Sequence, residues 1–469
     1  MFEVHRSPFS GSWYPSAAAE LERLLDDAFA ASQSRAPYLF PGALGLVVPH
    51  AGPAYSGTVA AAAYRVIERQ QPERIVLLAF PHRGGLNGVA APAVGAIGTP
   101  LGEVAIDPGF GEFAQAPEER LCDHSFEIQL PFLQRSATGA RITPLYVGRM
   151  RGSEREEAAE KLARLWRPGV VFVASSDFTH FGRTFGFTPF PADRMAADRL
   201  RELDFECIDA AATLDPLTFL DTLERNGATV CGSAPISLLL ATLRRLGAGL
   251  YQSTLDYQTS GEITGDFQHS VSYAALGFYP ARAFELDAAA REALLDSAAA
   301  TLRHARVAGE RLAIPAADAS PALRARLGLF VSLRRGDDLL GCIGELDGRV
   351  SLAEDVAAMT LSAALEDARF KPAASVKGPI DIEISALTPF RRIARAEDCR
   401  AGRHGLLLRL GGRAGLLLPQ VAAERGWTTE EFLQAVCRKT GVGPNAWKDP
   451  EARLYIFEAQ VFARRKAVE

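Results

Sequence analysis

The sequence predicts an α/β protein with two domains, the first spanning residues 1–282 and a separate α+β domain spanning 283–469. Three observations support this prediction. The length of 469 residues fits two large domains or about three average ones. In the first domain, short apolar runs alternate with amphipathic helical patterns, which is typical of a parallel sheet covered by helices. Beyond Pro280 the pattern changes to strands and helices mixed with hairpin-like turns.

The predicted elements of the first domain follow from these patterns. Apolar runs predict strands, and 3.6-residue periodicity with closing glycines predicts helices. The predicted strands are 43–50, 74–82, 141–147, 169–180, 250–261 and 270–279, and the predicted helices are 58–70, 153–166, 215–227 and 234–247. Ser153 is the expected N-cap of its helix, with Glu156 completing a capping box.

The second domain is predicted in the same way. One long amphipathic helix is expected at its start, and the GGRAG sequence at 411–415 indicates a hairpin-like turn. The predicted helices are 284–310, 351–370 and 428–441, and the predicted strands are 328–335, 380–387, 404–412 and 452–462.

Composition excludes several classes of protein. With 48% hydrophobic and 23% charged residues, the chain has too much apolar material to be disordered. A net charge of −5 argues against bulk nucleic-acid binding. No apolar run is long enough to cross a membrane, and the first residues do not resemble a secretion signal. We therefore expect a cytoplasmic protein with no membrane partner.

Three of the eight histidines, His50, His82 and His180, lie at the ends of predicted strands. Ligands of open α/β sheets bind beyond the carboxyl ends of the strands, so these imidazoles are expected to converge there. A single histidine at such a position is more often an ordinary polar loop residue. Three of them in a histidine-poor chain favour a metal or acid–base site.

Three further residues are candidates for the same site: Asp177, His124 and Cys231. Asp177 lies three residues before His180, and His124 begins a helix-like segment. Cys231 precedes a predicted helix, where the helix N-terminus is expected to lower the pKa of its thiol. The alternatives are that Asp177 caps a turn and that Cys231 is a small buried apolar residue.

The first domain resembles the Memo family, also called AmmeMemoRadiSam system protein B. The motifs that carry the resemblance are GSWYP, PHAGPAYSG, FPHRG, DHSFEIQLPFL, SSDFTHFG, CGSAPI and DYQTSGEITGD. The resemblance implies the fold of class III extradiol dioxygenases, which are non-haem iron enzymes. It also implies metal ligands at His50, His82 and Cys231, with Asp177, His180 and His124 in the same pocket as acid–base or positioning residues. Such a ligand set suits Fe(II) or Cu, and also Zn.

The second domain resembles the AMME-syndrome candidate family, also called AmmeMemoRadiSam system protein A. The resemblance rests on LLGCIGEL, AAMTLSAALEDARF, IEISALTPF and HGLLLRLGGRAGLLLPQVAAERGW. Cys342 is expected at a tight loop, either as a reactive thiol or as a packed residue. His404 is placed to face Cys342 if the fold brings them together, and Arg369 binds a substrate or forms a structural ion pair.

These resemblances imply a fusion of two components of a three-component system. The chain has no CxxxCxxC motif, so the radical-SAM component is expected to be a separate partner. The leading interpretation is a metal-dependent redox or dioxygenase-like enzyme acting on an unknown substrate. The alternatives are a non-catalytic module that binds peptides or anions, and a metal chaperone.

Overall fold

The apolar runs of the first domain form the centre of one mixed sheet. The computed structural model describes residues 4–107, 113–247, 249–307 and 321–468, and the chain divides into two units, Met1–Ala283 and Phe284–Glu469. In the described part of the first unit the strand order is β10-β12-β2-β9-β3-β8-β4-β7, with β11 beside β12. The bounds are β2 Gly45–Val48, β3 Arg74–Ala79, β4 Val89–Pro92, β7 Ala114–Ala116, β8 Arg141–Val147, β9 Val170–Ser175, β10 His180–Gly182, β11 Leu250–Thr259 and β12 His269–Pro280.

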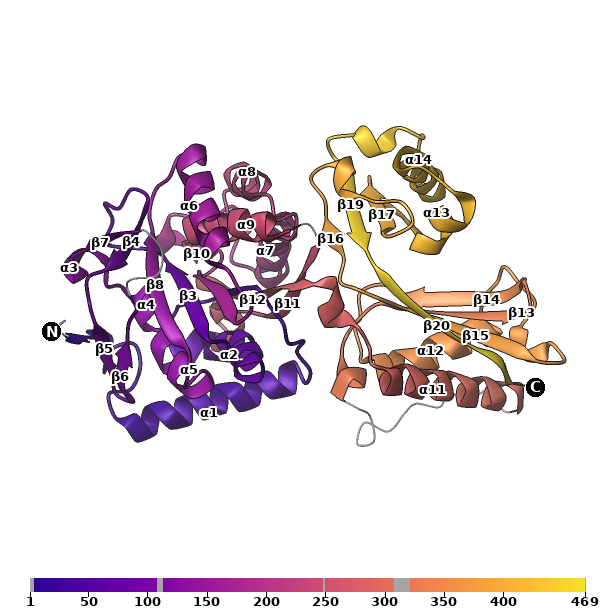
Figure 1. Cartoon of the computed structure of the whole chain (residues 1–469), viewed down its shortest axis with the longest axis horizontal. Helices are drawn as coiled ribbons and strands as arrows, with labels where there is room; N and C mark the ends of the chain where they lie inside the picture. The colour runs from indigo at the N-terminus through magenta and orange to yellow at the C-terminus, as the bar shows by residue number, and fades with distance from the viewer. Residues whose placement is uncertain (1–3, 108–112, 248, 308–320, 469) are drawn as a thin grey trace. The chain divides into compact units, whose positions relative to one another are not determined.

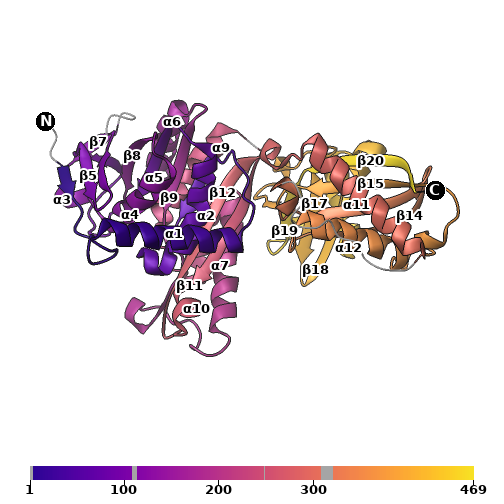
Figure 2. The same ribbon diagram turned by 90° about the horizontal axis from the view of Figure 1, so that it is seen from below.

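Helices cover both faces of this sheet (Figure 1). Helix α9 packs on β9, β3 and β8 beside α6, while α2 packs on β2 and β12 beside α1 and α5. Figure 2 shows α1 lying alongside α2. The helix bounds are α1 Ala18–Arg35, α2 Pro53–Gln70, α4 His124–Glu127, α5 Gln129–Ser136, α6 Gly152–Leu165, α7 Ala196–Ala212, α8 Pro216–Asn226 and α9 Ser233–Leu246. Because both faces are covered, the central strands are buried along their whole length.

The α/β prediction is confirmed for the first unit, but some boundaries are wrong. Helix α6 begins before Ser153: its N-cap is Arg151, whose backbone N–H donates to Glu154, so Glu156 forms no capping box. The predicted strand 169–180 ends at Ser175, where the backbone turns toward the polar residues that follow. Helix α1 was not predicted.

The described residues of the second unit form two four-stranded antiparallel sheets, ordered β14-β13-β15-β20 and β16-β19-β17-β18. Helices α11 and α12 pack on the first sheet, and α14 packs on the second. The bounds are α11 Ala288–Val307, β13 Leu329–Arg335, β14 Asp338–Glu345, α12 Leu352–Leu365, β15 Ile380–Leu387, β16 Arg391–Arg392, β17 Gly405–Leu410, β18 Arg413–Leu417, α13 Pro419–Arg425, α14 Thr429–Thr440, β19 Arg453–Phe457 and β20 Ala459–Val468.

Two strand predictions in this unit are wrong in detail. The predicted strand 452–462 is two strands, because the chain leaves one sheet at Glu458 and enters the other as β20. The predicted strand 404–412 ends at Leu410, followed by a hairpin turn in which Gly411 and Gly412 have φ values of 56° and 76°. Such values suit the tight turns that join antiparallel strands. The predicted helix 284–310 begins later, at Ala288, and its last three residues lie outside the described part of the chain.

None of the helices formed by the described residues combines the length and apolar character needed to span a membrane.

Candidate metal centre

Three adjacent parallel strands end at the same edge of the first unit's sheet. Val48 of β2 pairs with Ser175 of β9, and Leu78 of β3 pairs with Ala174. The segment after β2 carries His50, and the segment after β3 carries His82. Two of the predicted imidazoles, those of His50 and His82, therefore lie beyond the same edge of the sheet.

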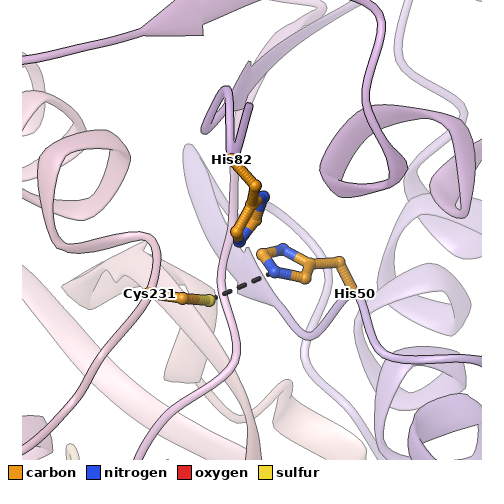
Figure 3. Close-up of side chains that lie close together, drawn as sticks. All are labelled: His50, His82 and Cys231. Atoms are coloured by element: carbon orange, nitrogen blue, oxygen red, sulfur yellow. Dashed lines mark hydrogen bonds between the residues drawn. The ribbon is translucent and has the colours of Figure 1, made fainter. Parts of the chain in front are cut away.

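His50, His82 and Cys231 form a compact cluster (Figure 3). One donor atom from each lies within 4.8 Å of the others. The Sγ atom of Cys231 is 3.1 Å from Nε2 of His50, and the two imidazole rings are 5.1 Å apart and nearly perpendicular. This is the set of residues that the family resemblance implies as metal ligands.

Ser175 sets the protonation pattern of the His50 ring. The Ser175 hydroxyl donates its only proton to the carbonyl oxygen of Ser125. Its oxygen also lies 3.0 Å from Nδ1 of His50, so Nδ1 must carry the proton in this contact. The lone pair of the neutral imidazole is then on Nε2, the nitrogen that faces Cys231.

Asp123 orients His82 in a similar way. Its side chain is 4% exposed, and its Oδ1 atom lies 2.9 Å from Nδ1 of His82. It also caps α4 by accepting from the backbone N–H of Ser125. A carboxylate on one ring nitrogen of a histidine is a common arrangement beside metal sites, because it fixes the ring and leaves the other nitrogen for the metal.

His124 extends the imidazole cluster toward the surface. Its ring lies 4.2 Å from that of His82 and 5.2 Å from that of His50. On its other side the ring of Trp13 is 4.6 Å away. Burial, together with the neighbouring His82 imidazole, lowers the pKa of His124 to about 4, so this ring is neutral at pH 7.

The Asp177 carboxylate binds the backbone of the loop that carries His50. Its Oδ1 atom accepts from the backbone N–H groups of His50 and Ala51, at 2.8 and 3.2 Å. Burial raises the pKa of this carboxyl group above its usual value. The two backbone hydrogen bonds hold the loop that presents His50.

His180 lies at the start of β10, close to the same thiol. Asp177, His180 and Cys231 form a second group whose donor atoms lie within 4.8 Å of one another. Nδ1 of His180 faces the carbonyl oxygens of Phe178 and Thr229, at 3.0 and 3.1 Å, and therefore carries a proton. Its Nε2 is then the nitrogen available to accept or deliver a proton.

The expected lowering of the Cys231 pKa is wrong for the protein without a cation. Cys231 does precede helix α9, but burial and the nearby Asp177 carboxylate raise the pKa of its thiol far above the usual value. Burial likewise lowers the pKa of His50 well below its usual value, and the positive charges that His124 and His82 would carry act in the same direction. A neutral His50 imidazole beside a thiol fits a divalent metal, whose charge would stabilise the thiolate.

The sequence interpretation missed Ser175, Gln129 and Trp13. Gln129 donates to the Ser175 hydroxyl oxygen and to the Pro49 carbonyl oxygen, at 3.0 and 2.8 Å. A polar residue at the last position of a buried strand was the available signal for Ser175. Nothing in the local sequence distinguishes Gln129 from other polar helix residues.

The candidates in the second unit are not assembled as expected. Cys342 lies within strand β14 rather than in a tight loop, and Arg369 donates to its carbonyl oxygen at 2.6 Å. Arg369 also pairs with the buried Asp367 carboxylate at 2.7 Å. Of the two roles expected for Arg369, this contact fits the structural ion pair. His404 precedes a strand of the other sheet, where Nδ1 accepts from the Arg400 backbone N–H. No hydrogen bond joins His404 to Cys342 among the residues described.

Comparisons with known proteins agree with this two-unit organisation. A family model described as "Memo-like protein" matches residues 6–277, and one described as AMMECR1 matches residues 295–462. A MEMO1 family protein of Methanosarcina acetivorans is 33% identical over 285 residues, covering 58% of this chain and 98% of the relative. Protein MK0488 of Methanopyrus kandleri is 41% identical over 150 residues, covering 30% of this chain and 72% of the relative. The crystal structure of an uncharacterized protein from Pyrococcus horikoshii is 34% identical in sequence and has a TM-score of 0.34. The matched region covers 36% of this chain and 89% of the Pyrococcus chain.

Proposed function

Since the chain belongs to the Memo family through residues 6–277 and carries an AMMECR1 domain over residues 295–462, we propose that it is a non-haem metal-dependent redox enzyme. The proposed ligands are His50, His82 and Cys231, and the proposed metal is Fe(II) or Cu. Two imidazoles and one thiolate also accept Zn, which would not support redox chemistry.

One observation carries the proposal. Both candidate imidazoles have Nδ1 held by a polar partner, Ser175 for His50 and Asp123 for His82. Each ring therefore keeps its Nε2 for a metal, and the Cys231 sulfur lies within reach of both. A site built only for packing would not need this polar support behind each ring.

The surrounding residues have separate roles in this proposal. A redox-active metal, when bound, supplies one-electron and oxygen chemistry. His180 holds or delivers a proton at Nε2, because its Nδ1–H is fixed by backbone carbonyl groups. Asp177 keeps the His50 loop in place through two backbone hydrogen bonds. The Trp13 ring packs on the His124 ring, 4.6 Å away, and holds it beside His82.

A separate radical-SAM protein is the proposed partner, as the resemblance to the AmmeMemoRadiSam system implies. The AMMECR1 domain is proposed to bind the substrate, whose identity is open. Fusion would keep the two domains at high effective concentration, which favours successive action on one molecule.

The test uses the whole chain purified without a histidine tag and loaded anaerobically with Fe(II) or Cu(I). Elemental analysis should find one metal that is lost in His50→Ala, and the loaded protein should consume O₂ in the presence of ascorbate. Metal uptake without O₂ consumption would favour the metal chaperone. Failure of the wild type to retain either metal would contradict the enzyme and favour a peptide- or anion-binding module.

A further inference from the structure

A second cluster of metal-binding side chains lies in the first unit, outside the site described above. It consists of His5, Cys122 and Glu127, whose donor atoms all lie within 4.8 Å of one another. None of the three belongs to the proposed redox site. The same kinds of donor atom are found in zinc sites of proteins: imidazole nitrogen, thiolate sulfur and carboxylate oxygen.

Three separate elements bring these residues together. His5 is the middle residue of strand β1 (Val4–Arg6), which pairs with β5 (Ala96–Thr99) at the position of Ile97. Cys122 follows the short helix α3 (Glu118–Leu121). Glu127 is the last residue of α4. The cluster therefore connects β1 to Cys122 at the end of α3 and to α4.

Glu127 gives the strongest indication of a missing ligand. Its side chain is 0% exposed, and Oε1 is 3.2 Å from Nε2 of His5. Its other oxygen, Oε2, is buried without a hydrogen-bond partner among the residues described. A buried carboxyl oxygen with no hydrogen-bond partner destabilises the fold, and more so when the group is charged. A bound cation would satisfy it.

We propose that His5, Cys122 and Glu127 bind a Zn²⁺ ion, separate from the metal held by His50, His82 and Cys231. Three protein ligands of these types match zinc, and the fourth position would be filled by water. Glu118 supports the His5 ring from its other nitrogen: its Oε1 lies 3.4 Å from Nδ1 of His5, and its side chain is 33% exposed. The site is independent of the proposed redox function.

The competing interpretation is a simple ion pair between His5 and Glu127. The hydrogen bond from Glu127 raises the pKa of His5, although burial opposes it. An ion pair, however, leaves Oε2 of Glu127 without a partner among the residues described. It also predicts that metal has no effect on the cluster, which makes the two interpretations separable.

Cobalt(II) alone is the probe, because a thiolate ligand gives it an intense charge-transfer absorption. The background is the whole chain carrying His50→Ala and Cys231→Ser, which removes ligands of the first site. We expect this protein to bind one Co²⁺ with a thiolate band, and Zn²⁺ to displace it. Adding Cys122→Ser should abolish the band. Adding His5→Ala should lower the affinity for Co²⁺ by more than about 100-fold, because loss of an outer-shell partner alone lowers metal affinity by about 10- to 100-fold.

Matched controls are Cys399→Ser, a buried cysteine of the second unit, and His269→Ala, an exposed histidine of the first. Both should leave the thiolate band unchanged. Thermal unfolding without metal verifies that each variant is folded, and added Zn²⁺ should raise the midpoint only where the three ligands are intact. The proposal is overturned if the background protein binds no Co²⁺, if the bound Co²⁺ lacks the thiolate band, or if the band survives Cys122→Ser. As a second readout in the chain that keeps the first site, after saturation with Zn²⁺, His5→Ala should lower the zinc content by one ion, and an unchanged content would also overturn the proposal.

Discussion

The sulfur of Cys231 lies 3.1 Å from Nε2 of His50, the ring nitrogen that carries no proton in the tautomer set by Ser175. The thiol proton is therefore the one that a metal would replace. Burial keeps the Cys231 thiol protonated and the His50 imidazole neutral before a metal binds. Cys231 and His50 would therefore bind the metal directly, whereas Ser175 would act only by orienting the His50 ring.

Cys231→Ser and His180→Ala should differ in metal binding. Cys231 offers the only sulfur in its cluster, so its loss should weaken Fe(II) or Cu(I) binding strongly. His180 has Nδ1 held by carbonyl groups and is proposed to move protons, so His180→Ala should leave binding little changed while lowering O₂ consumption. Isothermal titration under anaerobic conditions measures both affinities. Equal losses of affinity would show that His180 is itself a ligand.

Ser175→Ala should weaken metal binding without removing a ligand. The substitution leaves Nδ1 of His50 without its partner, so the ring can rotate or change tautomer. Loss of such a partner typically lowers metal affinity by about 10- to 100-fold. Ser237→Ala, at a buried serine of α9 that bonds only its own helix backbone among the described contacts, is the control. Equal affinity in Ser175→Ala and the wild type would refute the tautomer argument.

The stability of the first unit should fall in mild acid because of His124. Its pKa is lowered by burial from 6.5 to about 4, so between these values the unfolded chain takes up a proton that the folded chain does not. The stabilisation is thus complete above pH 6.5 and is lost as the pH falls toward 4, a difference of about 3 kcal/mol.

Calorimetry of His124→Asn between pH 7 and pH 4 tests this dependence. Asparagine keeps a donor near Asp123 but cannot titrate, so the variant should lose less stability on acidification than the wild type. His269→Asn, at an exposed histidine, should behave like the wild type. Parallel curves for His124→Asn and the wild type would show that His124 is not the titrating group.

The sequence was sufficient to predict which strands form the centre of the sheet and which histidines follow them. Buried strands such as β3 and β9 are continuous apolar runs, and His50 and His82 lie directly after such runs. The support behind the histidines is predictable only in part, because the sequence shows a polar residue at the end of β9 but not what it contacts. Ser175 acts through the carbonyl group of Ser125, which is 50 residues away in the chain, and no local pattern encodes that contact.

The error about Cys231 has a related cause. Cys231 does precede α9, but the position of a thiol before a helix does not by itself determine its pKa. Burial and the Asp177 carboxylate act in the opposite direction, and both depend on tertiary packing. The sequence shows that the Cys231 thiol precedes a helix, but it does not show how deeply the fold buries that thiol.

The role of the glycines around Cys342 also depends on tertiary packing. A tight loop was expected from the GCIG sequence, but the segment is strand β14, packed against helix α12. A Cβ atom at Gly341 would lie 2.1 Å from the carbonyl oxygen of Ala363 in that helix. The glycine is therefore required for close packing of the strand on the helix.

Gly341→Ala should destabilise the second unit, because neither backbone can yield without separating the strand from the helix. Overpacking of this kind typically costs about 1–3 kcal/mol. Gly443→Ala is the matched control, since a Cβ there meets no atom within 4 Å. Calorimetry of the whole chain should show the unfolding transition of the second unit lowered by Gly341→Ala alone, with metal binding by His50, His82 and Cys231 retained. An unchanged transition would mean that β14 and α12 are not held as closely as the structure places them.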